Sequence, residues 1–143
     1  MRIDFVSARS IPDTRGQPTI ETTLRAGALR ATASVPSGKS TGSHEACELR
    51  DPDGGVARAV ANVESEIAGA LTGHDFHSAD EIDAMLIALD GTPDKSRLGA
   101  SALLSVSIAA MRLFALHEGV PLWSAIAERG TRHFGECAKY SEA

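Results

Sequence analysis

The sequence predicts an α+β domain in which a three-stranded antiparallel meander precedes about four helices. Apolar and polar residues alternate over residues 3–35, whereas apolar residues recur at helical spacing in the rest of the chain. No strand pattern returns between the helices, and this order favours α+β over a parallel-sheet architecture. The helices are therefore expected to cover one face of the meander. At 143 residues, the chain is too short for a TIM barrel, which needs about 250 residues.

The three strands are predicted from period-two alternation and from the turn residues between them. Residues 3–10 form the first strand, which is followed by a turn-rich stretch over residues 12–16. Residues 19–25 place Ile, Thr and Leu on one face and polar side chains on the other. After a turn around Gly27, residues 29–35 alternate in the same way. The second and third strands should form a hairpin with one apolar face.

Two helices are predicted between residues 56 and 91. Apolar side chains recur three or four positions apart over residues 56–71, and Gly73 can end that helix. Ser78 and Glu81 form a capping-box pattern before the second helix. That helix is expected to end at Gly91, since glycine readily adopts the left-handed conformation found at helix C-termini.

Two further helices are predicted after residue 99. Residues 100–118 are apolar on nearly every side, so this helix should be central and covered by its neighbours. Pro121 opens a shorter helix that is expected to end near Gly130. Residues 131–143 are polar and show no period, which predicts a frayed tail. We accordingly predict a domain over residues 1–130 and a polar tail over residues 131–143.

Composition and charge restrict the class of protein. The chain has 14 Lys and Arg against 19 Asp and Glu, a formal net charge of −5. This balance argues against nucleic acid or an anionic membrane as a partner, and we predict neither. Cys47 and Cys137 are too few for a disulfide framework or a four-cysteine zinc site. We find no secretory leader and no apolar run of about 20 residues, so we expect a soluble, cytoplasmic protein.

Local motifs with chemical meaning are weak when their spacing is checked. Residues 38–41 end like a P-loop, but position 33 is Ala where the motif needs Gly, and the preceding strand belongs to a hairpin. Residues 51–54 look like the start of a calcium loop, yet Asn62 occupies the position of its bidentate Glu. A polar turn is expected at residues 51–54.

Histidines and carboxylates do not form a clear catalytic or metal-binding pattern. Residues 74–77 place two imidazoles near a carboxylate, but no third ligand is close in sequence. The carboxylates over residues 80–83 are explained by the preference for acidic side chains in the first turn of a helix. No Ser, Thr or Cys has a local base partner, so we assign no catalytic residue. From residue patterns alone, the chain is an α+β domain with one hydroxyl-rich loop over residues 36–43.

Four sequence blocks, in the same order, resemble enolase (phosphopyruvate hydratase). They are ARSIPDTRGQPTIE at residues 8–21, VPSGKSTG with the following HEA and ELRD at residues 35–51, LDGTPDKSRLGA at residues 89–100, and EGVPL at residues 118–122. Together they cover roughly residues 3–130. The resemblance implies the N-terminal domain of that family, a meander with helices that precedes a barrel.

The resemblance also implies a reaction and a source for its catalytic groups. Enolases remove water from 2-phosphoglycerate to give phosphoenolpyruvate, a step of glycolysis, and Mg²⁺ stabilises the charge that develops. In this family the base, the acid and the carboxylate ligands of the first Mg²⁺ come from the barrel. The chain stops at Ala143, before a barrel, and is therefore expected to be inactive without a barrel partner.

The part of the family's site that falls within this chain is the mobile lid loop. Ser40 matches the loop serine whose carbonyl and hydroxyl oxygens bind the second Mg²⁺. Closure of this loop also keeps water from the charged intermediate. Arg9 and Glu21 match positions that pair with barrel residues of the other subunit in the enolase dimer, and without a barrel we expect both to be solvated. The predicted substrate loop consists of Ser37, Gly38, Lys39, Ser40, Thr41 and Gly42.

Three departures from the family pattern bear on function. Lys39 stands where a small residue is usual, and its cation can either hold a phosphate or carboxylate or repel the second Mg²⁺. The connection after Asp51 is shortened to residues 52–55, and the residues after Gly130 do not resemble the entry into the barrel. The first two departures suggest relaxed constraint on the site, and the third suggests a genuine chain end.

Three hypotheses about function follow from these observations. The first is a capping half of an enolase-type lyase, which supplies the lid loop and Ser40 to a barrel made as a separate chain. The second is a non-catalytic binding or regulatory module that self-associates, because a helix face that meets the barrel in enolases would be exposed. The third, weaker hypothesis is a fragment of a longer enolase. The substitution Ser40→Ala separates the first two, because only the first needs this serine for reconstituted activity.

Overall fold

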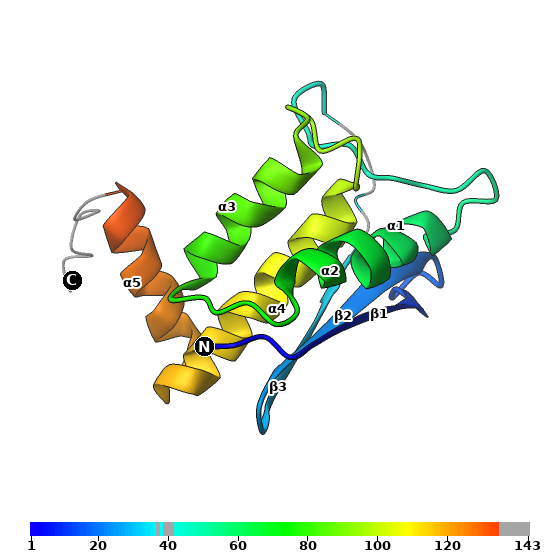
Figure 1. Ribbon diagram of the computed structural model, residues 1–143. Helices are drawn as coiled ribbons and strands as arrows, with labels where there is room; N and C mark the ends of the chain where they lie inside the picture. Colours follow the sequence, from blue (N-terminus) through cyan, green and yellow to red (C-terminus); the bar gives the residue numbers. More distant parts are fainter. Residues whose placement is uncertain (37, 39–41, 135–143) are drawn as a thin grey trace.

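A three-stranded antiparallel sheet and a layer of helices make up the domain (Figure 1). The computed structural model describes residues 1–36, 38 and 42–134. All helices follow the strands in the chain, so the predicted α+β class and the predicted meander are confirmed, and the described residues form no barrel. The strands are hydrogen-bonded in chain order and are β1 (Phe5–Pro12), β2 (Pro18–Ala26) and β3 (Leu29–Val35).

The first strand begins at Phe5, later than the predicted residue 3. The residues before it pair with a segment that is distant in the chain. The Met1 carbonyl accepts the Phe76 N–H at 2.9 Å, and the Ile3 N–H donates to the His74 carbonyl at 3.1 Å. This pairing draws Ile3 into the core, where it is fully buried. The prediction failed here because local alternation carries no information about such distant partners.

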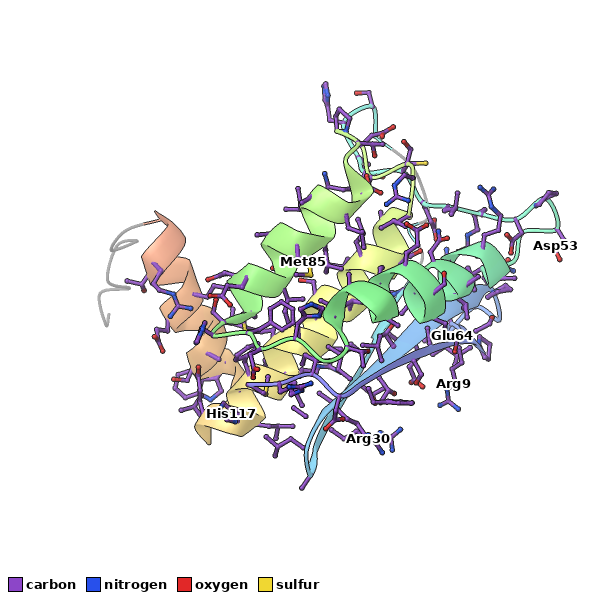
Figure 2. All side chains as sticks on the ribbon, in the orientation of Figure 1. Arg9, Arg30, Asp53, Glu64, Met85 and His117 are labelled. Carbon is purple, nitrogen blue, oxygen red and sulfur yellow. The ribbon has the colours of Figure 1, made fainter. Side chains whose placement is uncertain are left out.

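The sheet has one face toward the helices and one toward solvent. Ile20 and Leu24 of β2 are fully buried, as the alternation predicts. Thr22 lies between them on the same face, and its hydroxyl forms a 2.7 Å hydrogen bond with the buried hydroxyl of Ser105 on a helix. Arg9 points away from the helical layer on the opposite face of the sheet (Figure 2). The helices therefore cover one face of the meander, as predicted.

The predicted helix over residues 56–71 is a continuous helical segment with a π-helical turn in its middle. Its first N–H groups are capped by Asp51, whose carboxylate accepts the Ala57 N–H at 2.5 Å and the Arg58 N–H at 3.3 Å. The negative charge also suits a helix N-terminus. Residues 51–54 are therefore the predicted polar turn, with a capping function added. The segment comprises α1 (Ala57–Asn62), η1 (Val63–Ile67) and α2 (Ala68–Leu71).

The next helix, α3 (Ala79–Asp90), begins and ends as its sequence predicts. The Ser78 hydroxyl accepts the Glu81 N–H at 3.3 Å, and the Glu81 carboxylate accepts the His77 N–H at 2.8 Å. This is a variant of the capping box, because the glutamate reaches one residue further back than usual. Gly91 ends the helix with a left-handed φ of 69°.

The longest helix, α4 (Ala100–Glu118), is central, as predicted. It packs across β2 and β3 and lies between the sheet and the two helices α3 and α5 (Leu122–Phe134) (Figure 1). By length and composition α4 could cross a membrane, but 56% of its most apolar window is buried inside the protein. Because core helices of this kind are covered by their own domain, α4 does not indicate a membrane span.

The last helix, α5, does not end near Gly130 as predicted but continues to Phe134. A glycine inside a helix lowers stability by only about 1 kcal/mol relative to alanine. Arginines on either side of Gly130 form ion pairs that bind this helix to α3. Arg129 Nε lies 2.5 Å from Asp80 Oδ1, and its guanidinium also pairs with Asp83. These ion pairs connect residues far apart in sequence, so the helical period alone did not reveal them.

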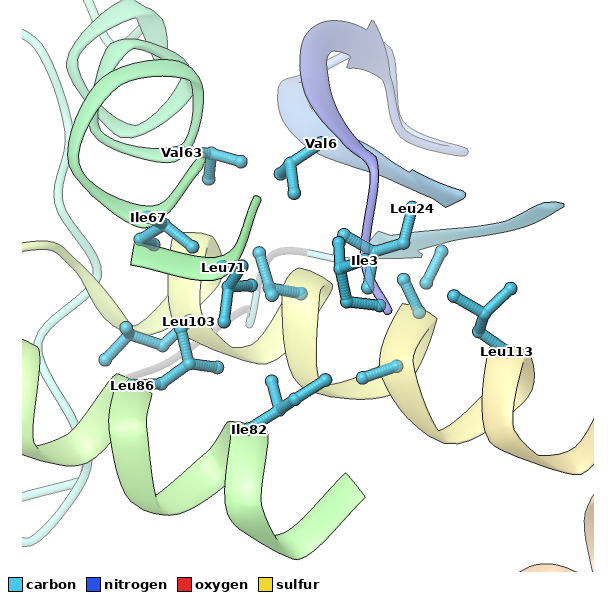
Figure 3. Close-up of a cluster of buried hydrophobic side chains, with 14 of the residues drawn as sticks. Ile3, Val6, Leu24, Val63, Ile67, Leu71, Ile82, Leu86, Leu103 and Leu113 are labelled. Atoms are coloured by element: carbon cyan, nitrogen blue, oxygen red, sulfur yellow. The ribbon is translucent and has the colours of Figure 1, made fainter. Parts of the chain in front are cut away.

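The core lies between the sheet and the helices (Figure 3). Most of its side chains are aliphatic, in keeping with an aromatic content of 4%, and Phe76 and Phe114 are its aromatic members. Complete burial of one such side chain contributes about 1.5–3 kcal/mol. Fully buried members come from the N-terminal segment, β2, η1, α2, α3 and α4, and include Ile3, Leu24, Val63, Ile67, Leu71, Ile82, Val106 and Leu113.

Part of the helical layer is left uncovered. Large apolar side chains on α3, α4 and α5 are about half exposed or more, although similar side chains elsewhere fill the core. The enolase resemblance predicts such a face, since it implies that a helix face of this domain meets the barrel. These exposed side chains are Ile87, Leu104, Leu116, Trp123 and Ile126.

Candidate functional site

The hydroxyl-rich loop over residues 36–43 connects β3 to the segment before α1. Gly38 and Gly42 are described, and both are exposed. The structure therefore does not test the prediction that Ser40 is a metal ligand or that this loop contacts substrate, but it does describe how the two ends of the loop are held. The other four residues of the predicted substrate loop lie outside the described part of the chain: Ser37, Lys39, Ser40 and Thr41.

The N-terminal end of the loop is fixed to the sheet. Val35, the last residue of β3, is buried and lies opposite Ile20 of β2. Its carbonyl accepts a hydrogen bond from the hydroxyl of Thr19, a residue that is itself 3% exposed. The following Pro36 is exposed. Thr19 thus holds the point at which the chain leaves the sheet.

The C-terminal end of the loop is fixed to the connection between α3 and α4. The Cys47 N–H donates to the Asp94 carbonyl at 2.6 Å, and the Cys47 carbonyl accepts the Ala100 N–H at 2.8 Å. Nearby, a Cβ added to Gly99 would lie 2.7 Å from the Leu49 Cβ. Gly99 also has a φ of 95°, so both its conformation and the close approach of Leu49 require glycine.

One guanidinium extends this attachment to the sheet. Arg50 Nη2 pairs with Glu48 Oε1 at 2.7 Å. Its Nη1 donates to the Pro18 carbonyl at 2.6 Å and to the Gly54 carbonyl at 3.0 Å. Arg50 therefore joins the segment after the loop to the start of β2 and to the turn that caps α1. Such planar, multi-donor contacts are what distinguish arginine from lysine at a structural junction.

The α3–α4 connection is itself organised around the buried carboxylate of Asp90. This carboxylate accepts the Thr92 N–H at 3.0 Å and the Leu98 N–H at 2.8 Å. Burial raises the pKa of Asp90, but the hydrogen bonds from Thr92 and Leu98 outweigh burial and lower the pKa below its ordinary value. Arg97 Nε adds a 3.1 Å hydrogen bond to the Asp90 carbonyl. The connection that receives Cys47 is thus held by several mutually supporting hydrogen bonds.

Arg9 and Glu21 form an ion pair on the face of the sheet that is turned to solvent, and Arg9 is solvated as expected. They lie opposite one another in the β1–β2 register, and Arg9 Nη2 is 2.6 Å from Glu21 Oε1. The Arg9 side chain is 73% exposed and the Glu21 side chain 21%. An exposed cross-strand pair of this kind contributes at most about 1 kcal/mol. Their role at an interface remains a prediction.

Comparison with known proteins agrees with this arrangement. Residues 3–126 match the family model described as "Enolase, N-terminal domain". The chain belongs to the enolase family. It is 48% identical over 130 residues to Enolase 2 of Pseudomonas syringae pv. syringae (strain B728a), which confirms the resemblance seen in the sequence. The alignment covers 85% of this chain but only 30% of that relative, so the chain spans less than a third of the relative's length.

The described part of this enolase domain holds no cluster of the usual metal-binding side chains. No group of three or more His, Cys, Asp or Glu side chains in the described residues could hold a metal ion.

Sequence reasoning missed the residues that hold the ends of the enolase loop. The alternation over residues 19–25 places Thr19 on the polar face of β2, and the cysteine count says nothing about the backbone of Cys47. One available signal was the order Asp90, Gly, Thr92 after a helix, because Asp often accepts the backbone N–H two residues on. The contribution of Cys47 had no such signal, since it is made by its backbone.

Proposed function

We propose that this enolase N-terminal domain caps an enolase barrel and supplies the lid for dehydration of 2-phosphoglycerate to phosphoenolpyruvate in cytoplasmic glycolysis. The observation that carries the proposal is the anchoring of both ends of the loop. Thr19 holds Val35 on one side, and Asp94 and Ala100 hold Cys47 on the other. A loop with fixed ends can move over a substrate while its attachment points stay in place.

Within the lid, we assign Ser40 as the residue that contacts the second Mg²⁺. A serine offers hydroxyl and carbonyl oxygens, which suit this hard cation. When bound, Mg²⁺ stabilises negative charge on the reacting carboxylate. The catalytic base, the acid and the carboxylate ligands are assigned to the barrel, because this chain has no candidate for them. On this proposal the domain is inactive by itself.

The surface proposed to meet the barrel is the groove between α3 and α4. The groove has a volume of about 540 Å³ and is lined mainly by apolar side chains, among them Ile87 and Leu104. Ala46, just after the loop, also lines it, and so does Lys95. A barrel seated in this groove would therefore lie beside the C-terminal attachment of the lid.

A chimera in which this chain replaces the N-terminal domain of Enolase 2 tests the proposal. The chimera should form phosphoenolpyruvate from 2-phosphoglycerate. Ser40→Ala should reduce this activity by about 10-fold to 100-fold, the usual effect of removing a group that supports a metal site. Ser65→Ala, on the exposed side of η1, is the matched control and should have no effect. A folded chimera that is inactive, or one in which Ser40→Ala keeps full activity, would contradict the lid role.

The alternative is a non-catalytic, self-associating module derived from enolase. The departures at Lys39 and at residues 52–55 favour it, as do the exposed Trp123 and Ile126. It predicts no dehydration of 2-phosphoglycerate with any barrel and a concentration-dependent oligomer of the chain in sedimentation equilibrium. A monomer that yields an active chimera would exclude this alternative.

A further inference from the structure

A second groove lies near the end of α4 that is remote from the lid. It has a volume of about 440 Å³ and lies between β3, the C-terminal turns of α4 and the connection to α5. Along α4, Leu116 in this groove is about 24 Å from Ala100, which holds the lid attachment. The two surfaces are therefore separate. We call it the arginine groove, and the residues used below are Arg30, Arg112, Leu116, Val120 and Leu122.

The arginine groove has an apolar lining that is open to solvent. Leu116 is 52% exposed and Val120 is 36% exposed, and Leu122 is half-buried beside them. Single exposed apolar side chains are common on proteins. Here three of them meet in one concavity, where an apolar side chain of a partner would remove them from water together. This is the usual composition of a docking pocket.

Two positive charges line the same groove. Within the described part of the chain, neither Arg30 nor Arg112 has a carboxylate partner, and no Asp or Glu lines the groove. Arg112 Nη1 donates to the Thr32 carbonyl, which fixes this guanidinium beside β3. Its remaining N–H groups can still bind an anion, since a guanidinium has five donors.

The setting of Arg30 makes an acidic partner favourable. In the β2–β3 register it lies opposite Arg25, and like charges in that position repel. The positive charge of Arg25 is offset by Asp4, whose Oδ1 lies 3.9 Å from Arg25 Nε, and by the Phe5 ring, whose centroid lies 4.8 Å from Arg25 Cζ. Arg30 points outward near the hairpin that joins β2 and β3 (Figure 2), and a carboxylate bound there would offset its repulsion with Arg25.

We propose that the arginine groove docks an acidic amphipathic segment of a partner protein. An apolar side chain of the segment occupies the space lined by Leu116 and Val120, and adjacent carboxylates pair with Arg30 and Arg112. Charge complementarity selects this partner, because the chain as a whole carries a net charge of −5 and repels anions elsewhere. Nucleic acid would need a longer basic surface to neutralise several phosphates.

Three synthetic peptides test the proposal on the intact chain. The first alternates leucine and glutamate, the second has lysine in place of every glutamate, and the third has serine in place of every leucine. Titration of the ¹⁵N-labelled chain should shift the amides of Arg30, Leu116 and Val120 with the first peptide alone. Equal binding of the lysine peptide, shifts confined to other surfaces, or no binding at millimolar concentration would each overturn the proposal.

Substitutions in the groove provide the second arm. Arg30→Gln and Arg112→Gln should each weaken binding of the leucine–glutamate peptide by at least about threefold, the effect of one partly exposed ion pair. Leu116→Ser should weaken it as well. Arg58→Gln, an exposed arginine on α1, is the matched control and should bind as the parent does. Unchanged binding by folded Arg30→Gln and Arg112→Gln would refute the proposal. None of these variants touches the lid, so the outcome does not bear on Ser40.

Discussion

Asp90 and Leu98 are joined by a hydrogen bond of 2.8 Å that closes the connection between α3 and α4. The carboxylate is 2% exposed and also accepts the Thr92 N–H. Through Asp94 and Ala100, the same connection holds the Cys47 backbone, just after the loop over residues 36–43. A buried carboxylate in one turn thus supports the attachment of a loop distant from it in sequence.

Replacing Asp90 with Asn should destabilise the domain in a pH-dependent way. An amide can accept with only one of its two heavy atoms, so a buried N–H loses its partner at a cost of about 1–3 kcal/mol. The pKa of Asp90 in the folded protein is lowered from its ordinary value of 3.8. The ionised carboxylate therefore stabilises the fold above pH 3.8, and this stabilisation is lost as the pH falls through the folded-state pKa.

Urea unfolding of the parent, Asp90→Asn and the control Glu64→Gln at several pH values checks this prediction. Glu64 is an exposed carboxylate on η1, so its amide variant should match the parent. The difference between parent and Asp90→Asn should be greatest near neutral pH and shrink below about pH 4. A difference that grows toward acid would show that Asp90 does not stabilise the fold as a carboxylate.

Gly99→Ala should loosen the attachment of the segment that follows the loop over residues 36–43. Its new Cβ would meet the Leu49 Cβ at 2.7 Å, and the φ of 95° is strained for alanine. Together these effects should lower the free energy of unfolding by about 2–4 kcal/mol. Amide hydrogen exchange should speed up at Cys47 and Ala100 more than in the core.

The control for this substitution is Gly130→Ala. Gly130 lies inside α5 with no neighbour within 4 Å of an added Cβ. There the alanine should raise stability by up to about 1 kcal/mol, since it favours the helix. If both alanine variants had the same effect on unfolding, the close approach at Gly99 would not be the cause.

Removing Arg129 should release the last turns of α5. Burial lowers the pKa of Arg129, but the carboxylates of Asp83 and Asp80 outweigh burial and raise it. Arg129→Gln leaves two neighbouring carboxylates without this cation and should cost about 1 kcal/mol of stability. Hydrogen exchange should accelerate along α5 while α4 stays protected. Raising the salt concentration should reduce the difference in the free energy of unfolding between variant and parent. Hydrogen exchange that accelerates evenly over the whole domain would argue against a local attachment.

The Arg9–Glu21 pair should matter little to the stability of the isolated domain. Alanine at both positions is expected to change the free energy of unfolding by less than about 1 kcal/mol, because the pair is largely exposed. If these residues lie at a subunit interface, as the enolase resemblance implies, the same double variant should weaken dimerisation of the chimera with Enolase 2. Sedimentation velocity measures this, and an unchanged dimer would remove both residues from the interface.

The sequence alone determined the elements whose signals are local. The hairpin of β2 and β3 followed from alternation around Gly27, and α3 followed from Ser78 at its start and Gly91 at its end. Each signal acts within a few residues, through side-chain alternation, a cap or a permitted left-handed φ. Short sequence motifs also indicated the family, and they are the basis for the prediction that Ser40 binds a metal ion.

Only the tertiary structure decided the features that depend on partners distant in the chain. Met1 and Ile3 pair with residues after α2, Arg129 binds α5 to α3, and the Cys47 backbone attaches the segment after the loop to the α3–α4 connection. In each case the stabilising contact is a hydrogen bond or ion pair whose geometry exists only after the helices have packed on the sheet. Local periodicity reports which face of an element is buried, but it carries no information about which distant group will meet it there.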